Sequence, residues 1–187
     1  MKKIQSLFKR NYDGDRLIRN EVVHGSEWVI NGEGHATIKF DGTCCMIRDG
    51  KLYKRYEIKN GGKPPESFEP ACEVDSVTGK QQGWLPVGDG PEDQWHREGL
   101  AGMSNKQDGT YELVGPKIQG NPEKLDIHKL MLHGSKVPTE DPPRTFVELK
   151  EWIKDKDIEG IVWHHTDGRM VKIKKKDFGL KRIAKSQ

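Results

Sequence analysis

A lysine and a carboxylate stand close together in the segment Lys39-Phe40-Asp41-Gly42-Thr43. Extended backbone would direct Lys39 and Asp41 to one face, because side chains alternate along a strand. A lysine can act as a nucleophile when a desolvated or cation-rich site lowers its pKa. A surface lysine beside a turn gives the same pattern, and for this segment taken alone it is the better interpretation.

A second group of charged residues lies near the C-terminus. Lys172 and Lys174 alternate with Val171 and Ile173, so both lysines are predicted on one face of a strand. Two ammonium groups on one face suit a triphosphate. For a lone Lys-x-Lys pattern, however, an amphipathic edge hairpin with solvated lysines is the better interpretation.

Two carboxylates, Glu159 and Glu112, stand at or near other predicted strands. With a two-residue loop at Asp167-Gly168, Ile161 is predicted opposite Lys174, and Glu159 falls on the same face. A carboxylate suits Mg²⁺, which prefers hard oxygen ligands together with phosphate. Glu112, in another predicted strand, is a further carboxylate that could bind a ribose hydroxyl, although such residues more often face solvent.

Antiparallel hairpins are predicted to position these groups. Asp-Gly pairs favour tight turns, and they stand between several apolar segments. The predicted strands are 43–47, 52–56, 110–114, 129–133, 160–164 and 170–174. This pattern indicates a mixed α+β fold rather than an alternating parallel one.

One helix is predicted after Pro142-Pro143. Thr145 and Glu148 have the spacing of a capping box. A core-facing stripe follows at helical spacing, formed by Phe146, Leu149, Trp152 and Ile153. The segment 60–109 is rich in Gly, Pro and charge, with isolated Trp84 and Trp95, and we interpret it as a long insertion in a single domain.

Composition bounds the class of protein. The chain has 187 residues, 33% of them hydrophobic and 33% charged, which suits one globular domain with a heavily charged surface. No apolar run is long enough to span a bilayer. The three cysteines, Cys44, Cys45 and Cys72, cannot form a full disulfide framework, and no Cys or His pair has zinc spacing, so we expect a reducing cytoplasmic setting and no zinc site.

Charge is distributed unevenly along the chain. Residues 1–20 contain six Lys or Arg and two Asp, and residues 171–187 contain seven Lys or Arg and one Asp, although the net charge is only +3. Clustered basic residues suit a polyanionic partner such as a nucleic acid or a nucleotide. Solvated termini would have the same composition.

Taken in order, these segments resemble the motif series of the covalent nucleotidyltransferases, the superfamily of ATP-dependent DNA ligases, RNA ligases and mRNA capping enzymes. The motifs are Lys39-x-Asp41-Gly42, the strand ending in Lys54-Arg55, Tyr111-x-Leu113-Val114-Gly115, Glu159-Gly160-Ile161-Val162 and Val171-Lys172-Ile173-Lys174. The segment 39–45 is similar to that of short RNA ligases of the vertebrate 5′-to-3′ type. The resemblance covers residues 33–182 and implies two antiparallel sheets flanking an ATP groove, with outer helices.

The resemblance also implies roles for single residues. Lys39 would be the nucleophile that takes AMP from ATP, and Lys172 and Lys174 would hold the phosphates as further catalytic residues. Glu159 would help to place Mg²⁺ or Mn²⁺, with Asp41 as a second candidate ligand. The expected ATP contacts are Ile38, Lys39, Asp41, Gly42, Arg55, Glu112, His133, Glu159, Lys172 and Lys174.

Two of these residues, His133 and Arg55, match the family pattern less closely than the others. Related ligases stack adenine on an aromatic residue, and His133 is the candidate here, a surface histidine being the alternative. Arg55 would contact ribose or phosphate. Ideal pairing across Asp49-Gly50 sets Arg55 opposite Cys44 and by parity puts Lys54, not Arg55, on the face of Lys39, unless a bulge follows Gly42.

The expected activity is that of a monomeric ATP-dependent RNA ligase in RNA repair, which joins 5′-phosphate and 3′-hydroxyl ends of RNA. No appended C-terminal domain is expected, so RNA would be held by basic residues alone: Lys2, Lys3, Lys9, Arg10, Lys174, Lys175, Lys176 and Lys181. The alternatives are a DNA or RNA–DNA nick ligase on the same fold, a capping guanylyltransferase, and a non-catalytic nucleotide- or RNA-binding module.

Overall fold

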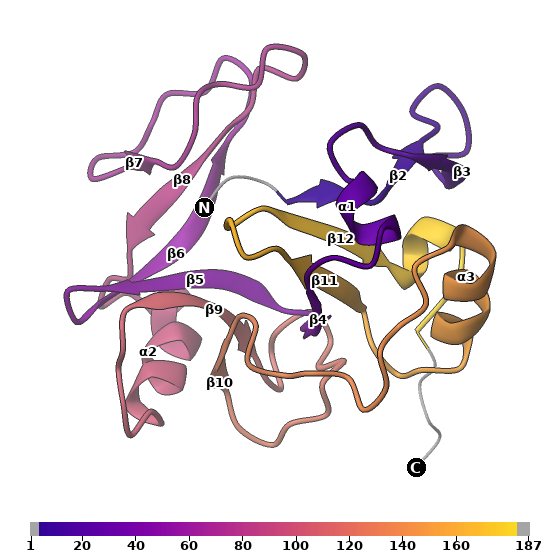
Figure 1. Ribbon diagram of the computed structural model, residues 1–187. Coiled ribbons are helices and arrows are strands. Elements are labelled where there is room, and N and C mark those ends of the chain that lie inside the picture. The colour runs from indigo at the N-terminus through magenta and orange to yellow at the C-terminus, as the bar shows by residue number, and fades with distance from the viewer. Residues whose placement is uncertain (1–3, 183–187) are drawn as a thin grey trace. The chain divides into compact units, whose positions relative to one another are not determined.

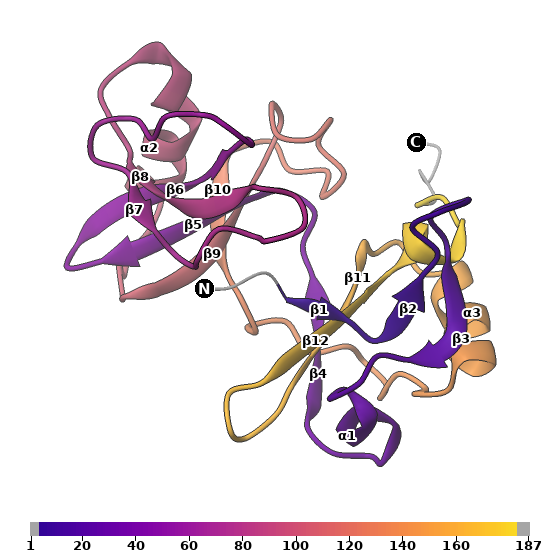
Figure 2. The same ribbon diagram turned by 90° about the horizontal axis from the view of Figure 1, so that it is seen from above.

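The computed structural model describes residues 4–182, which form two compact units (Figures 1 and 2). The discontinuous unit comprises residues 4–40 and 134–182, and the central unit comprises residues 41–133. Both are mixed α+β, mostly sheet with few helices, as the sequence predicts. None of the helices within residues 4–182 has the length and apolar character needed to cross a bilayer.

The discontinuous unit is built on a four-stranded sheet in the order β1-β12-β11-β4. Its strands are β1 (Gln5–Ser6), β12 (Met170–Lys174), β11 (Gly160–His164) and β4 (His35–Lys39), and only the β1–β12 pairing is parallel. The other elements are the ribbon β2 (Phe8–Arg10) and β3 (Ile18–Val22), and the helices α1 (Glu27–Ile30), α3 (Phe146–Lys154) and η2 (Lys175–Phe178).

The core of the discontinuous unit lies on one face of this sheet. Ile161, Trp163, Val171 and Ile173 are buried there with Leu149 and Ile153 of α3. Lys172 and Lys174 lie on the opposite face, so the predicted alternation of lysines and apolar residues in β12 is confirmed. The residues that could do chemistry are therefore held on the back of a packed sheet.

The predicted helix is confirmed as α3, but its capping box is not formed. Leu149 and Ile153 are fully buried, and Phe146 and Trp152 pack against the same core. The hydroxyl of Thr145 donates to the Glu148 carboxylate at 2.6 Å instead of accepting a backbone N–H.

The central unit contains a six-stranded sheet in the order β10-β9-β5-β6-β8-β7. The strands are β10 (Lys129–Leu132), β9 (Gly109–Val114), β5 (Thr43–Arg48), β6 (Lys51–Ile58), β8 (Gln81–Pro86) and β7 (Glu69–Pro70). The helices η1 (Pro91–Asp93) and α2 (Gln94–Ala101) follow β8, and α2 lies against the sheet (Figure 1). Cys45, Ile47, Tyr111 and Leu113 form the core on that face.

Residues 60–109, interpreted from the sequence as an insertion, supply part of this sheet. β8 pairs with β6 along its whole length, and Trp84 on β8 is buried. Trp95 on α2 packs against the core and stacks on His128 at 4.5 Å between ring centroids. Both tryptophans thus help to order the segment.

The two predicted Asp-Gly hairpins differ in outcome. Asp49 and Gly50 have φ of 51° and 71°, as a two-residue type I′ turn requires, and the predicted register between β5 and β6 is confirmed. Lys54 and Arg55 consequently face opposite sides. The parity argument that linked them to Lys39 was wrong, because β4 and β5 belong to different sheets.

The second hairpin has a longer loop than predicted, and its register is shifted by one residue. The backbone N–H of Gly168 donates to the carbonyl of His165, and the N–H of His165 donates to the carbonyl of Arg169. Gly168 has φ of 90°, so a three-residue loop with a left-handed glycine replaces the two-residue turn. Lys174 therefore pairs with Gly160 rather than with the predicted Ile161, and Lys172 pairs with Val162.

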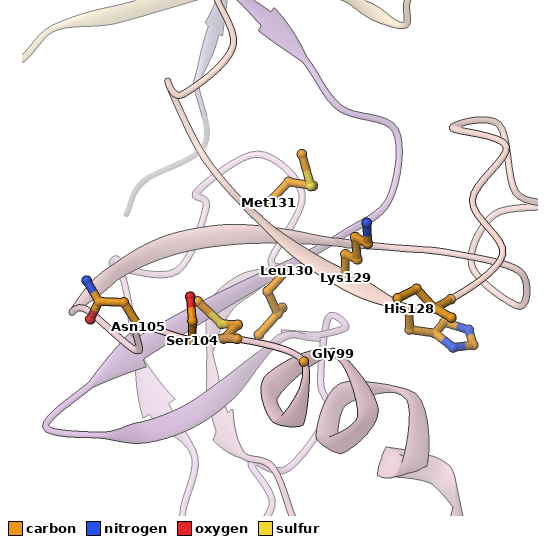
Figure 3. A pocket seen from close by; sticks show the side chains of 10 residues that line it. Gly99, Ser104, Asn105, His128, Lys129, Leu130 and Met131 are labelled. Atoms are coloured by element: carbon orange, nitrogen blue, oxygen red, sulfur yellow. The ribbon is translucent and has the colours of Figure 1, made fainter.

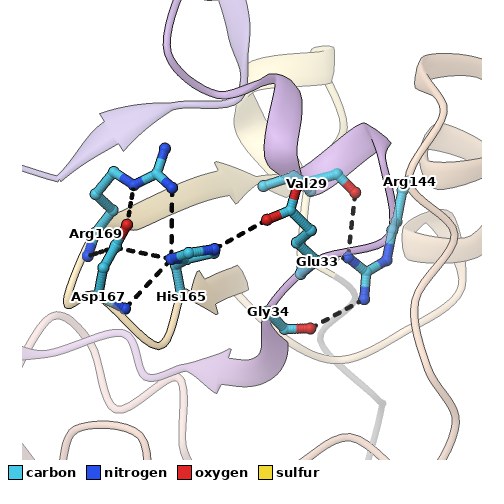
Figure 4. Close-up of polar contacts among 7 residues, drawn as sticks. All are labelled: Val29, Glu33, Gly34, Arg144, His165, Asp167 and Arg169. Carbon is cyan, nitrogen blue, oxygen red and sulfur yellow. Dashed lines mark hydrogen bonds and ion pairs between the residues drawn. The ribbon is translucent and has the colours of Figure 1, made fainter.

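A polar cluster joins this hairpin loop to the segment after α1 (Figure 4). The imidazole of His165 lies 3.0 Å from the Glu33 carboxylate and 2.8 Å from that of Asp167. The guanidinium of Arg144 donates to the backbone carbonyls of Glu33, Val29 and Gly34. Hydrogen bonds to Glu33 and then Asp167 raise the pKa of His165 above its ordinary value of 6.5.

This raised pKa gives a testable dependence of stability on pH. A group whose pKa is higher in the folded state stabilises the fold fully below its unfolded pKa, and the contribution is lost as pH rises through the folded pKa. Wild type should therefore unfold at a higher temperature than His165→Gln at pH 5.5, and the difference should shrink by pH 9. Thermal denaturation followed by circular dichroism measures both. A difference that does not change with pH would contradict the assignment.

Candidate functional site

Two lysines flank a glycine on the face of the discontinuous unit's sheet that lies opposite the core. Gly160, in the middle strand β11, pairs with Lys39 of β4 on one side and with Lys174 of β12 on the other. Directly paired residues share a face, so both lysine side chains leave the sheet on the same side. A Cβ on Gly160 would lie 2.0 Å from the backbone oxygen of Ile173, so this position requires glycine.

Glu159 binds both lysines. Its Oε2 lies 2.5 Å from Nζ of Lys39, and its Oε1 lies 2.9 Å from Nζ of Lys174. The three side chains are only 11–20% exposed, so water screens the ion pairs weakly. We call Lys39 and Lys174, together with the Glu159 carboxylate that bridges them, the bridged pair of lysines.

Electrostatics keep this carboxylate charged. Burial by itself raises the pKa of Glu159, but the ammonium groups of Lys39 and Lys174 outweigh burial and hold the pKa below its ordinary value of 4.5. Glu159 is thus an anion at neutral pH, with one oxygen toward each lysine. Such a carboxylate can offer an oxygen ligand to a cation that comes between it and a lysine.

The contact between Glu159 and Lys174 was predicted from the wrong register. Glu159 precedes the first residue of β11, so strand alternation does not fix its side chain. Its backbone carbonyl accepts the N–H of Lys175, while its side chain turns toward the lysine face. The expected association is found because the residue lies just outside the strand.

Lys172 lies one row further along the same face. It pairs with Val162, which in turn pairs with Thr37 two residues before Lys39. The hydroxyl of Thr37 lies 2.8 Å from Nε2 of His164, a contact that sequence reasoning missed. The alternation of β4 would have placed Thr37 on the face of Lys39, and that was the available signal.

The central unit brings other predicted residues together. Glu112 is 7% exposed, and its Oε1 accepts the backbone N–H of Gly42 at 3.1 Å. Its Oε2 lies 2.8 Å from Nε2 of His133. Cys44, directly opposite Glu112 in the sheet, belongs to the same cluster, which sequence reasoning did not find.

Three further predicted residues are held by the backbone or by neighbours in their own unit. The N–H of Asp41 donates to the Glu123 carboxylate at 3.2 Å. Arg55 donates to the side chain of Gln82, and its guanidinium lies over the ring of Trp84. The register of β5 and β6 puts Arg55 on the same sheet face as Cys44. Ile38 packs against the hydrophobic core, so its side chain is on the face away from Lys39.

The predicted basic contacts for nucleic acid separate into two groups. Lys176 and Lys181 are exposed. Lys175 is buried, and its Nζ donates to the carbonyl of Lys156 at 2.6 Å, so it does not present its charge to a phosphate.

Lys9 and Arg10, the two predicted N-terminal contacts that the structure describes, already have acidic partners. Lys9 pairs with Glu21, and Arg10 pairs with the buried Asp177. Lys2 and Lys3 lie outside the described residues.

A pocket of about 270 Å³ lies in the central unit between α2 and β10 (Figure 3). Gly99, His128 and Leu130 line it, together with residues of the loop after α2. None of the candidate site residues from the sequence analysis lines this pocket. The candidate site therefore remains with the bridged pair of lysines.

Comparison with known proteins gives a consistent result. Residues 97–186 match the RNA ligase 1 family. RNA ligase 1 of Mus musculus is 26% identical over 95% of this chain and 77% of its own length. RNA ligase 1 of Pongo abelii is 27% identical over 92% of this chain and 76% of its own length, and that of Danio rerio is 32% identical over 42% of this chain.

Proposed function

We propose that this protein, which its similarities identify as an RNA ligase family member, is an ATP-dependent RNA ligase that joins 5′-phosphate to 3′-hydroxyl ends through a covalent lysyl-AMP. The observation that carries the proposal is the bridged pair of lysines. It combines a candidate nucleophile, a second cation and an anionic oxygen donor within one shielded cluster. We further propose that the chain adopts the nucleotidyltransferase fold of covalent ligases.

The first step needs a neutral amine at Lys39. Its nitrogen attacks the α-phosphorus of ATP, a nitrogen–phosphorus bond forms, and the bond to the β-phosphate oxygen breaks to release pyrophosphate. The ammonium form has no lone pair, so a proton must pass from Lys39 to solvent before attack. The ion pair with Glu159 holds Lys39 in place before ATP binds.

Lys174 and Lys172 supply positive charge on the same sheet face. We assign them to the triphosphate, where they neutralise charge that grows on the leaving pyrophosphate. Because both lysines stand on one face of β12, they can present their charge to the same group of phosphates. Thr37 and His164 hydrogen-bond to each other in the adjacent row of this face.

The donor set includes an oxygen ligand of the kind that magnesium prefers. Glu159 contacts both Lys39 and Lys174, and Mg²⁺ is commonly held by one or two carboxylates plus substrate phosphates. When bound, the ion would draw negative charge from the α-phosphate and so favour attack. Glu159 is the residue that would hold the ion, as an oxygen ligand beside Lys39 and Lys174.

The later steps return Lys39 to its starting state. A 5′-phosphate oxygen of RNA attacks the α-phosphorus of lysyl-AMP, the nitrogen–phosphorus bond breaks, and the amine takes up a proton. A 3′-hydroxyl then attacks the 5′-phosphate, loses its proton and releases AMP. Exposed Lys176 and Lys181 are the basic residues that we assign to the RNA backbone.

Glu112 is the residue of the central unit that we assign to the nucleotide. Its buried carboxylate, fixed by the N–H of Gly42, suits the hydroxyls of a ribose. His133 is hydrogen-bonded on both ring nitrogens, to Thr110 and Glu112, which leaves its ring face for an adenine.

The test is ligation of matched strands. Purified protein, ATP and Mg²⁺ are incubated with a 5′-phosphorylated RNA, a DNA of the same sequence, and an RNA with a 5′-hydroxyl. Joining of the phosphorylated RNA, with a transient adenylylated 5′ end, is expected. Equal or better joining of DNA would favour a nick ligase for DNA. ATP binding with neither lysyl-AMP nor joining would identify a binding module.

A further inference from the structure

We propose that Cys44, Glu112 and His133 form a site for a thiophilic divalent ion such as Zn²⁺ in the central unit. One ligand atom from each residue lies within 4.8 Å of the other two. Sulfur, nitrogen and oxygen from three side chains, with a fourth position left to water, are the donor set of open zinc sites. This site is distinct from Glu159, and it does not rest on the proposed function.

The sheet brings these three residues to one face from three adjacent strands. Cys44 on β5 pairs directly with Glu112 on β9. His133 follows β10, and its backbone N–H donates to the carbonyl of Thr110, which places it diagonally across from Glu112. The cluster therefore depends on strand register rather than on a short sequence motif.

Two neighbouring groups already orient the ligands. The N–H of Gly42 holds Oε1 of Glu112, so Oε2 is left to face His133. The Thr110 hydroxyl lies 3.0 Å from Nδ1 of His133, where it can accept a hydrogen bond from Nδ1–H in the tautomer that leaves the lone pair on Nε2. Metal-binding histidines are usually fixed in this way through their second nitrogen.

The fit requires a small opening of the cluster. Nε2 of His133 and Oε2 of Glu112 are 2.8 Å apart, whereas ligands about 2.0 Å from a tetrahedral ion lie about 3.3 Å from each other. An ion would replace the hydrogen bond between them: the thiol of Cys44 would release its proton to solvent, and the ring proton of His133 would move from Nε2 to Nδ1, which faces the Thr110 hydroxyl.

The two adjacent cysteines, Cys44 and Cys45, lie on opposite faces of the sheet, and only Cys44 lies on the face of the proposed metal site. Cys45 points to the core, where it is fully buried among apolar side chains and cannot reach the ligand face. Cys44 is half-buried on the ligand face. A thiolate favours Zn²⁺ or Co²⁺ over Mg²⁺, which prefers oxygen.

The experiment is a Co²⁺ titration of chelator-treated protein without nucleotide, followed by displacement with Zn²⁺. One equivalent with a thiolate-to-cobalt absorption band is expected. Cys44→Ser should abolish the band and weaken Zn²⁺ binding at least about 10-fold, since even loss of an outer partner costs that much. His133→Gln should weaken binding similarly, and circular dichroism checks that both variants fold.

Cys72→Ser is the matched control, because it removes a half-buried thiol elsewhere in the same unit. It should leave the band and the affinity unchanged. The proposal is overturned if Cys44→Ser binds Zn²⁺ as tightly as wild type, or if Cys72→Ser lowers binding as much as Cys44→Ser. Because Glu112 is also assigned to the ribose, bound zinc would compete with ATP, and this consequence alone rests on the proposed function.

Discussion

Replacement of Lys39 is expected to abolish the covalent label when purified protein is incubated with Mg²⁺ and α-labelled ATP and run on a denaturing gel. Lys39→Ala removes the nitrogen that would bond to phosphorus. Lys39→Arg removes it too, because a guanidinium is not deprotonated in proteins, yet it keeps a positive charge beside Glu159. Both variants should give background label, whereas wild type gives a labelled band.

Comparison of Lys39→Ala with Lys39→Arg distinguishes loss of the nucleophile from loss of stability. Lys39→Arg can still pair with Glu159, so its unfolding temperature should stay closer to that of wild type than that of Lys39→Ala. Lys150→Ala, on the exposed face of α3, is the control lysine and should label normally. Label retained by Lys39→Arg would assign the nucleophile to another residue, and label gained from GTP instead of ATP would favour capping chemistry.

Local sequence patterns correctly predicted much of the fold. The Asp49-Gly50 pair correctly predicted both the turn and its register, because an Asp-Gly pair tolerates the two left-handed residues that a two-residue hairpin needs. The alternation in β12 correctly separated lysines from the core. The spacing of Leu149 and Ile153 correctly predicted a helix and its buried face.

The second Asp-Gly pair shows the limit of such patterns. The Asp167 carboxylate accepts the N–H of Arg169, and of the two turn residues only Gly168 has a positive φ. The same dipeptide thus served a longer loop, which shifted every pair in the hairpin by one residue. Hydrogen bonds of the loop, not the dipeptide, decided the register.

Positions that depend on distant pairing could not be read from the sequence. Cys44, Glu112 and His133 meet because three strands align in one register, and no spacing along the chain encodes that alignment. Lys175 stands in a run of three lysines that looks exposed, but η2 turns its side chain inward to the carbonyl of Lys156. Both features required the folded structure.

Glu159→Gln is expected to damage both stability and adenylation. It leaves Lys39 and Lys174 as two shielded ammonium groups without their shared anion. Removing one partner of a buried ion pair costs about 3–5 kcal/mol, and the partial exposure here argues for about 2 kcal/mol or more at pH 7. Urea denaturation measures this loss, and the labelling gel measures adenylation.

The pH dependence distinguishes this electrostatic role from a change in packing. The folded pKa of Glu159 is depressed, so its stabilisation is fully present above the ordinary value of 4.5 and is lost as pH falls through the lower folded pKa. The gap in unfolding free energy between wild type and Glu159→Gln should therefore be constant from pH 6 to 7 and narrow below 4.5. A gap that persists unchanged at acid pH would mean that glutamine fits the site badly for steric reasons. A narrowing gap with normal labelling would confine Glu159 to stability and remove it from the reaction.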